Sequence, residues 1–398
     1  MQGLSEVFIA GASRTPIGKF GGSLLHFTAR DLGVTAAKAA MERAGVAPDQ
    51  VEETIFGHAR PAGVGPNLGR QIHYYSGAPV EAPAYTINKA CGSGLKALIL
   101  GSQEIALGHA DIVLVGGAES MSRVPYLMEG VRWGARMGHQ KLVDVMYRDG
   151  FLCPLSNMIM GETAEILAEE YHISRAEQDD FALASQRKAE AALGAKRFQE
   201  EIVPVTRPGK NGAPENFSLD EHVRQGVDLA DLAKLSPVFK KDGAITAGNS
   251  SGLTDGAAAL ILISGHKAKT LGVQPQARIV DYAAAGVDPR KMGLGPVPAI
   301  RKLFDRRRID FRDIDLIELN EAFAAQVIAC DRELQIPYEK LNVNGGAIAL
   351  GHPIGCTGAR IVVTLVHEML KRRARIGLAT LCISGGMGLA LLIENVSP

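Results

Sequence analysis

The chain has 398 residues, of which 46% are hydrophobic, and carries 43 basic and 43 acidic side chains. This length allows a large buried core divided over two or three domains. Because the net charge is zero, the composition gives no sign of nucleic-acid binding or of binding to an anionic membrane. The first residues lack the features of a secretion signal and no apolar run could span a bilayer, so we expect a cytoplasmic protein without membrane partners.

The cysteine pattern bears on redox state and on metal binding. The cysteines are odd in number, far apart and without a C-x-x-C pair. This spacing is untypical of a disulfide framework or a zinc site, so we expect reduced thiols and no bound metal. The five residues are Cys91, Cys153, Cys330, Cys356 and Cys382.

The first 120 residues alternate between apolar runs and helical patterns. A glycine-rich turn is expected at 11–19, and Gly45 and Gly108 suit the left-handed position that follows a helix. The alternation predicts a mostly parallel sheet covered by helices on both faces. The expected strands are 6–10, 51–56 and 111–115, and the expected helices run over 31–44 and from Cys91 to Gly108.

The composition changes near Ser120. From 121 to about 250 the chain has clusters of Met, Arg, Pro and Gly, two helical patterns and little strand signal. The second helix opens with Ser174 and Glu177 in capping-box spacing and runs to Gly194. This stretch is typical of an insertion lying over the sheet, and such excursions often carry a ligand site.

The remaining third of the chain repeats the pattern of the opening. A strand at 256–264 resumes the core, and a glycine-rich turn, helix and strand then recur in the same order as before. The sequence therefore predicts two similar α/β halves related by a pseudo-twofold axis. The repeated elements are strands 278–282, 314–319 and 377–383, a helix at 298–304 and a turn and helix at 351–373.

Cys91 stands between a short strand and a helix. The free N–H groups and positive dipole of a helix N-terminus stabilise a thiolate, which predicts a lowered cysteine pKa and a nucleophile. Two other interpretations stay open. A free cysteine is often only a small buried hydrophobe. Residues 92–97 also read G-x-G-x-x-A, a dinucleotide pattern with Glu119 as a possible ribose ligand, although residues 88–91 separate it from the strand.

Three further candidates lie in the second half, at strand ends where ligands bind in open α/β sheets. Asn320 follows one expected strand, and Cys382 lies near the end of another. His352 is followed by Pro353 and flanked by glycines, which places it on a stiff loop. The same residues interrupt any helix between His352 and Cys356, so a metal pair is excluded there.

Taken together, these stretches resemble the thiolase family, the coenzyme A-dependent acyltransferases of β-ketoacyl metabolism. The resemblance covers nearly the whole chain, and several loops match in the same order. The matching stretches are Ser13-Arg14-Thr15-Pro16, Cys91-Gly92-Ser93-Gly94, Gly116-Gly117-Ala118-Glu119-Ser120-Met121-Ser122, Asn320-Glu321-Ala322-Phe323, Gly351-His352-Pro353 and Cys382.

The resemblance implies the five-layer α/β/α/β/α thiolase fold with two duplicated α/β halves. One half would comprise 1–120 and 253–275, and the other 276–398. A loop domain at 121–252 would bind coenzyme A and supply tetramer contacts, chiefly through 122–140. Because the family is usually dimeric or tetrameric, we expect a homotetramer built as a dimer of dimers.

The resemblance also implies a coenzyme A channel, with CoA and acyl-CoA as substrates and no tightly bound cofactor. For the apolar members of the channel, simple core packing is the alternative. The channel residues would be Met160, Arg224, Phe239, Ala247, Ser251, Met292, Ala322 and Phe323.

The chemistry implied by the family uses four side chains. Cys91 would carry the acyl group as a thioester after passing its proton to His352. Cys382 would act as the acid/base at the α carbon of acetyl-CoA. A water held by Asn320, together with His352, would stabilise the enolate oxygen, and backbone N–H groups at Cys91 and near Ser384 would stabilise the tetrahedral intermediate.

The chain departs from the short-chain biosynthetic pattern near this expected site. Ile159 stands where those enzymes have a histidine, Met158 replaces an aromatic residue and Ser384 replaces a glycine. Residues 355–360 look more like those of degradative 3-ketoacyl-CoA thiolases. Acyl chains longer than that of acetoacetyl-CoA are therefore a further expectation.

Three other functions stay open at this point. A decarboxylating β-ketoacyl synthase-like enzyme would share Cys91 and His352, but would carry a second histidine at the place of Asn320 and no counterpart of Cys382. A non-catalytic acyl-CoA or lipid carrier would bind without releasing free thiol. A dinucleotide-dependent oxidoreductase would bind NAD.

Overall fold

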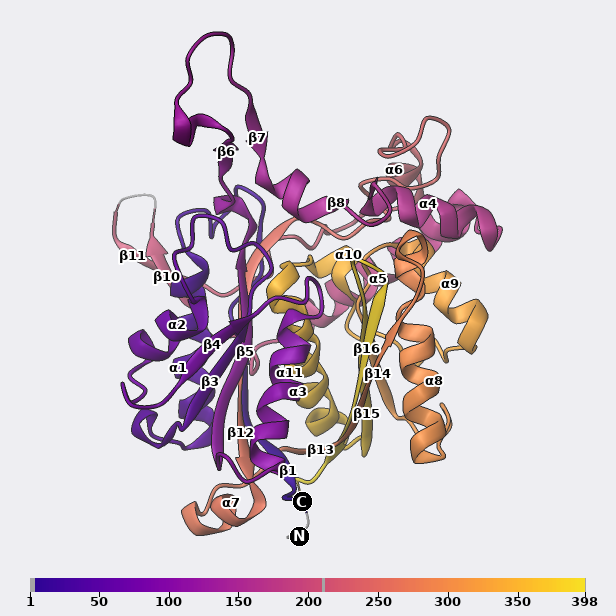
Figure 1. Ribbon diagram of the computed structural model, residues 1–398. Helices are drawn as coiled ribbons and strands as arrows, with labels where there is room; N and C mark the ends of the chain where they lie inside the picture. The colour runs from indigo at the N-terminus through magenta and orange to yellow at the C-terminus, as the bar shows by residue number, and fades with distance from the viewer. Residues whose placement is uncertain (1–3, 210–211, 398) are drawn as a thin grey trace.

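The strands and helices follow one another in nearly the order that the sequence predicts. The computed structural model describes residues 4–209 and 212–397 (Figure 1). No helix in these ranges is long and apolar enough to cross a membrane. The strands are β1 (Val7–Arg14), β2 (Gly18–Lys19), β3 (Glu53–Gly57), β4 (Ala84–Ile87), β5 (Ile112–Ser120), β6 (Tyr126–Met128), β7 (Leu142–Asp144), β8 (Leu152–Cys153), β9 (Met158–Ile159), β10 (Val205–Pro208), β11 (Pro214–Phe217), β12 (Thr254–Ser264), β13 (Ala277–Gly286), β14 (Leu316–Leu319), β15 (Ile376–Ile383) and β16 (Met387–Asn395). The α-helices are α1 (Ala29–Ala44), α2 (Leu68–Ser76), α3 (Ser93–Ala106), α4 (Met160–Glu170), α5 (Arg175–Gly194), α6 (Leu229–Ala233), α7 (Gly265–Leu271), α8 (Pro296–Arg307), α9 (Ala324–Leu334), α10 (Ala347–Leu350) and α11 (Ile354–Arg372).

The two α/β halves pack face to face around a central pair of helices. Strand order runs β14-β15-β16-β13-β1-β12-β5-β3-β4, and β1 joins β13 only through the pairs Phe8–Arg278 and Ile9–Ala277. Helices α3 and α11 lie between the two groups of strands, α1 covers the outer face of one group, and α8 covers that of the other (Figure 1). The layers therefore alternate helix, sheet, helix, sheet, helix, as predicted.

Helix α11 lies in the middle of the core, because its own apolar residues are distributed over all its faces. Ile361, Val362, Val363, Leu365 and Val366 are all buried, whereas a helix at the surface has one apolar face. Their contacts reach β5 and β12 on one side and β14 and β15 on the other. This helix fixes the distance between the two halves.

The prediction of a mostly parallel sheet is wrong. Only β3–β4, β3–β5 and β14–β15 pair in parallel, and the other pairs in the large sheet are antiparallel. Strand β12 returns after the long insertion and runs antiparallel to β5 and β1. Gly385 and Gly386 both have positive φ, which allows β15 to turn directly into β16.

The expected turn at 11–19 is also wrong at its start, because β1 continues through Arg14. Gly11 serves a different purpose there. A Cβ at this position would lie 2.3 Å from the Ala40 carbonyl oxygen and 2.7 Å from the Ala44 nitrogen. The glycine therefore lets α1 approach the strand closely.

Predicted helix ends are confirmed where capping residues define them. Gly45 caps α1 in the left-handed conformation, and Gly108 follows α3 with a φ of 76°. Helix α5 begins directly after its N-cap Ser174, with Glu177 completing the capping box in the first turn, and it ends at Gly194. Side chains that bond free backbone groups mark these boundaries in the sequence itself.

Within its described residues, the insertion carries the α-helices α4, α5 and α6 and the short ribbons β6–β7, β8–β9 and β10–β11. These ribbons were not predicted, because each of their strands has only two to four residues, too few to show an alternating pattern. Ribbon β6–β7 and its connecting loop project beyond the rest of the molecule (Figure 1). Trp133 and Met137 in this loop are 89% and 95% exposed.

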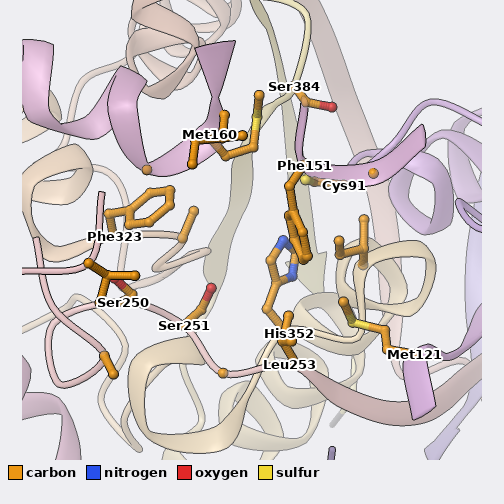
Figure 2. A pocket seen from close by; sticks show the side chains of 18 of the residues that line it. Cys91, Met121, Phe151, Met160, Ser250, Ser251, Leu253, Phe323, His352 and Ser384 are labelled. Atoms are coloured by element: carbon orange, nitrogen blue, oxygen red, sulfur yellow. The ribbon is translucent and has the colours of Figure 1, made fainter. Parts of the chain in front are cut away.

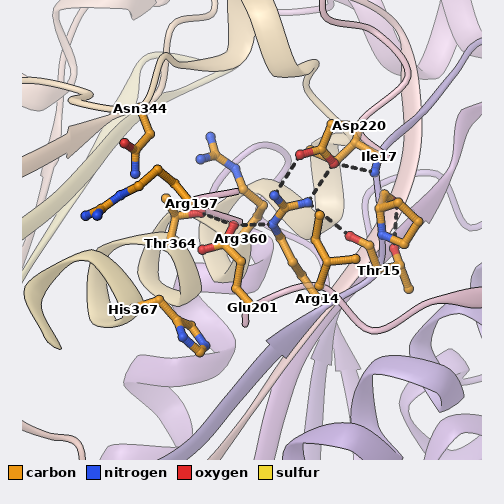
Figure 3. A network of polar contacts seen from close by, with 12 residues as sticks. Arg14, Thr15, Ile17, Arg197, Glu201, Asp220, Asn344, Arg360, Thr364 and His367 are labelled. Atoms are coloured by element: carbon orange, nitrogen blue, oxygen red, sulfur yellow. Dashed lines mark hydrogen bonds and ion pairs between the residues drawn. The ribbon is translucent and has the colours of Figure 1, made fainter. Parts of the chain in front are cut away.

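A buried ionic network ties the insertion to β1. The Arg14 guanidinium donates to Glu201 at 2.6 Å and to both oxygens of Asp220 at 2.7 and 2.8 Å. Asp220 also accepts the backbone N–H of Ile17. Figure 3 shows Arg14 between the two carboxylates. Since all three charged groups are buried, each depends on the others for its charge compensation.

Replacing Arg14 with methionine should therefore lower the free energy of unfolding by about 3–5 kcal/mol, because two buried carboxylates lose their counter-charge. Denaturant unfolding followed by circular dichroism measures this change. Arg278→Met is the control, since its ion pairs with Glu6 and Glu394 are partly exposed and should contribute at most about 1 kcal/mol. Equal losses in the two variants would contradict the prediction.

Candidate active site

A cavity of about 460 Å³ lies between the two halves and the insertion. Cys91, His352 and Cys382 all line it. Cys91 follows β4, and Cys382 is the second-last residue of β15. His352 lies on the loop between α10 and α11. Figure 2 shows Cys91 and His352 on the same side of the cavity, opposite Phe323 and Ser250. Residues from distant parts of the chain therefore meet in one space.

The turn that carries Cys91 is held by Ser93, the first residue of α3. Its Oγ accepts the Lys89 N–H at 2.8 Å and donates to the Ala90 carbonyl at 2.6 Å. Ala90 has a φ of 46°, a conformation that non-glycine residues adopt only when their surroundings impose it. The turn is thus fixed, with Cys91 just before the helix.

The glycines after Cys91 allow close packing, which argues against the dinucleotide interpretation. A Cβ on Gly92 would lie 2.5 Å from Ile383 Cδ1, and one on Gly94 would lie 2.7 Å from the Ala359 nitrogen. The first contact brings Cys91 to the end of β15, where Cys382 lies. Neither glycine is left free to face a pyrophosphate.

The expected low pKa of Cys91 is wrong. Burial raises the pKa of this thiol, and the nearby N–H of Ser384 and the charge of Arg60 offset only part of the effect. Desolvation of the thiolate therefore outweighs the helix N-terminus. The resting residue is a neutral thiol, and it needs a base to become a nucleophile.

His352 is built as that base. Its Nδ1 lies 2.6 Å from Thr357 Oγ1, and the single hydroxyl proton of Thr357 is donated to the Pro353 carbonyl at 3.0 Å. Nδ1 must therefore carry the ring proton. This leaves Nε2 unprotonated, and among the described residues it has no hydrogen-bond partner.

The imidazole of His352 is also kept neutral. Burial, followed by the charges of Arg360 and Arg60, lowers the pKa of His352 to about 3. A neutral ring with a free Nε2 lone pair can accept a proton throughout the physiological range.

Glu119 anchors the loop that carries His352. One oxygen of this buried carboxylate accepts the Gly355 N–H at 2.8 Å and the Ala59 N–H at 3.0 Å, and the other lies 3.0 Å from His58 Nδ1. The first interaction joins the loop to β5. Glu119 is thus buried and directed at groups of the protein itself, so it is not a ribose ligand.

Cys382 and Asn320 lie deeper than Cys91. Burial, and then the neighbouring Cys91, raises the pKa of Cys382 well above its usual value, so it is a protonated thiol. Asn320 does not line the cavity itself. Its side-chain Nδ2 and Oδ1 are buried without a partner among the described residues, which is the environment in which an internal water is retained.

All eight residues expected to contact coenzyme A line the same cavity as Cys91, His352 and Cys382. The Ser251 N–H donates to the Ala322 carbonyl at 3.0 Å, which joins the insertion to the loop after β14. The rings of Phe239 and Phe323 pack edge to face, with centroids 6.2 Å apart. The eight are Met160, Arg224, Phe239, Ala247, Ser251, Met292, Ala322 and Phe323.

Further lining residues were missed by the sequence analysis. Arg60 follows the carboxyl end of β3, so the rule that pointed to Asn320 could have found it. Met121 stands within a stretch quoted for the resemblance and Ile354 directly after another, but neither was given a role there. The remaining lining residues lie outside those stretches and include Tyr147, Phe151, His222, Val238 and Leu253.

The chain belongs to the thiolase family. A family model described as the thiolase N-terminal domain matches residues 7–266, and one described as the thiolase C-terminal domain matches residues 273–395. Two matching halves in one chain agree with the duplicated fold described above.

Within the family, the chain is similar to an acetyl-CoA acetyltransferase from Cupriavidus necator, with 52% identity over 392 residues, 98% of this chain and 100% of that protein. The crystal structure of the Bacillus anthracis acetyl-CoA acetyltransferase superposes with a TM-score of 0.97, 45% identity and full coverage of both chains. That of human mitochondrial 3-ketoacyl-CoA thiolase in complex with CoA gives a TM-score of 0.95 and 43% identity over 98% of both chains.

Proposed function

We propose that this protein transfers acyl groups between coenzyme A and the α carbon of acetyl-CoA. The reaction is 3-oxoacyl-CoA + CoA ⇌ acyl-CoA + acetyl-CoA, and with the shortest substrate it joins two acetyl-CoA to give acetoacetyl-CoA and CoA. The observation that carries the proposal is the meeting of two protonated thiols and one unprotonated imidazole nitrogen in a single cavity.

In the direction of cleavage, Cys91 passes its proton to His352 Nε2 and its sulfur attacks the 3-oxo carbon. The bond between that carbon and the α carbon breaks, and the shortened acyl group remains on Cys91 as a thioester. A second CoA thiol passes its proton to the Cys382 thiolate and attacks the thioester. Acyl-CoA is released, and Cys91 takes its proton back from His352. Splitting the transfer in this way replaces one difficult step with two easier ones.

Cys382 supplies the proton that the leaving α carbon needs, and in synthesis it removes that proton. Its raised pKa suits the donor role, because the thiol stays protonated until the carbanion forms. The N–H groups of Cys91 and Ser384 stabilise the tetrahedral oxyanion, and a water on Asn320 assists with the enolate. Loss of one such donor typically costs about 3 kcal/mol.

Coenzyme A is the substrate that we assign to the part of the cavity lined by the insertion. We divide the chain into one half comprising 1–120 and 253–275, another half comprising 276–398, and a loop domain at 121–252. The loop domain is the part to which we assign coenzyme A binding. The apolar lining and the single cation Arg224 suit a pantetheine chain leading toward a phosphate. Ile159, which also lines the cavity, is consistent with acyl chains longer than acetoacetyl.

A thiolysis assay tests this function. Purified protein with CoA and 3-oxoacyl-CoA substrates of increasing length should consume free thiol and release acetyl-CoA. Two residues disfavour the decarboxylating alternative. That class has a second histidine at the position of Asn320, and it has no cysteine that corresponds to Cys382. Condensation with malonyl-CoA but none with acetyl-CoA would reverse this conclusion.

We also propose a cytoplasmic homotetramer. All five cysteines are free, and the two thiols of the mechanism need a reducing compartment. The projecting segment 122–140, within ribbon β6–β7 and its loop, exposes Tyr126, Met128, Trp133 and Met137. Apolar side chains gathered on a protrusion are typical of a contact between subunits.

Trp133→Glu should accordingly convert tetramers into dimers, because a charge would be buried at the contact. Light scattering coupled to size-exclusion chromatography measures the mass. Leu4→Glu is the matched control, since Leu4 is 75% exposed and lies near the chain termini, at the opposite end from the ribbon (Figure 1). An unchanged mass for Trp133→Glu would refute the assignment of the contact.

A further inference from the structure

Arg60 introduces a positive charge at the Cys91 end of the cavity. It comes three residues after β3, and Cys91 comes four residues after β4. The two strands are parallel neighbours, with Gly57 paired to Ile87 at their ends. Both segments therefore emerge at the same edge of the sheet, and both residues line the cavity.

The Arg60 guanidinium is buried and incompletely bonded. The residue is 4% exposed. Its Nη1 donates to the Ala59 carbonyl at 3.1 Å, but Nε is buried without a partner among the described residues. No carboxylate in those residues forms an ion pair with it. Such a cation is costly to bury unless something compensates its charge.

The packing around Arg60 holds the guanidinium in place. A Cβ on Gly150 would lie 2.7 Å from Nε and 2.8 Å from Nη2, so the guanidinium packs directly against the backbone of this glycine. The Phe151 ring centroid is 5.8 Å from Cζ. The group is therefore positioned, and it is not a flexible surface side chain.

The surrounding protein leaves the charge available to a ligand. Met121, Phe151 and Ile354, which line this end of the cavity, are apolar. Two acids act on Arg60 without forming an ion pair with it, Glu119 and Asp149. Glu119 already accepts from Ala59 and Gly355 and contacts His58, and Asp149 accepts from Arg148. The channel assigned to coenzyme A has its own cation, Arg224, on the insertion. The ligand group that reaches Arg60 is thus the acyl chain on Cys91.

We propose that Arg60 selects acyl chains that end in a carboxylate, so that the preferred substrates are CoA thioesters of 3-oxodicarboxylic acids. This inference rests on the proposed function. A terminal carboxylate would give Arg60 a directly hydrogen-bonded counter-charge, which no carboxylate of the described residues provides, through the paired hydrogen bonds that guanidinium and carboxylate form.

The reaction is otherwise the one already described. The Cys91 sulfur attacks the 3-oxo carbon, the bond to the α carbon breaks, and the α carbon takes a proton to leave as acetyl-CoA. The acyl group that stays on Cys91 carries the distal carboxylate toward Arg60. A CoA thiol then attacks the thioester and passes its proton to the Cys382 thiolate. The carboxyacyl-CoA leaves, and Cys91 takes its proton back from His352.

The test compares two series of substrates in thiolysis by the wild-type protein. One series consists of 3-oxodicarboxylic acid monothioesters of CoA, and the other of uncharged 3-oxoacyl-CoA with the same numbers of carbons. At the best length, kcat/KM should be about tenfold or more higher for the carboxylate, because a site built for a polar group is left unsatisfied without it. A higher value for every uncharged partner would overturn the inference, yet the proposed function would stand.

Variants at Arg60 locate the cause of the preference. Arg60→Met should reduce the ratio of the two kcat/KM values by about tenfold or more, and Arg60→Lys should restore part of it because it keeps the charge. The control is Arg123→Leu, an exposed arginine on a smaller cavity that Arg60 also borders, and its ratio should not change. A loss of equal size for both substrates would show that Arg60 acts only on the Cys91 thiol. Absence of thiolysis with every substrate would instead refute the proposed function.

Discussion

Cys91→Ala should abolish the acyl-enzyme and reduce kcat for thiolysis by on the order of 10⁴-fold or more. Loss of a nucleophile removes the covalent pathway altogether, and what remains is the small effect of binding and of the oxyanion donors. The cavity offers no ready substitute, because burial, the largest cause of the raised pKa of the Cys382 thiol, remains in the variant and keeps that thiol protonated.

Two measurements establish this result. Mass spectrometry after mixing with a 3-oxoacyl-CoA should show the acyl adduct on wild-type protein and none on the variant. Cys330→Ala is the control, because that thiol is a buried residue of α9 and does not line the cavity. Undiminished turnover in a folded Cys91→Ala protein would mean that the acyl group is not carried by this sulfur.

Local signals in the sequence were sufficient where neighbouring residues decide the structure. The capping box at Ser174 and the left-handed Gly45 set helix ends regardless of the rest of the fold. Strand direction was not accessible in this way. The pairing of β12 with β5 depends on how the chain returns after more than a hundred residues of insertion, and no periodicity encodes that path.

In the candidate site, too, some features are decided by neighbouring residues and others by distant segments. Cys91, His352 and Cys382 could be found because glycines and proline mark their loops, and the structure places them around one cavity. The protonation state of Cys91 could not be found, since it depends on burial by distant segments that opposes the helix dipole. Arg60 was missed for a related reason. Its place after a strand is visible in the sequence, but its burial and its lack of an ion-pair partner, which single it out from other strand ends, depend on distant segments.

His352→Gln should lower kcat/KM for thiolysis by about 10²–10⁴-fold, the usual contribution of a positioned base. The pH dependence separates this role from a structural one. Since the pKa of His352 is about 3, the imidazole stays unprotonated as the pH falls from 8 to 5. The wild-type profile should therefore show no loss of activity from protonation of His352 in that range. The variant must give the Cys91 proton to solvent, and its rate should rise with pH.

Thr357 provides the matched test, because its hydroxyl fixes which ring nitrogen of His352 carries the proton. Thr357→Val should lower kcat by about tenfold or more while leaving KM for CoA nearly unchanged, since the ring is then free to adopt the other tautomer. Thr357→Ser keeps the hydroxyl and should retain most of the activity. A fall in wild-type activity with an apparent pKa near that of free histidine would show that His352 is exposed to protonation. The free Nε2 would then not be the resting base on which the transfer from Cys91 depends.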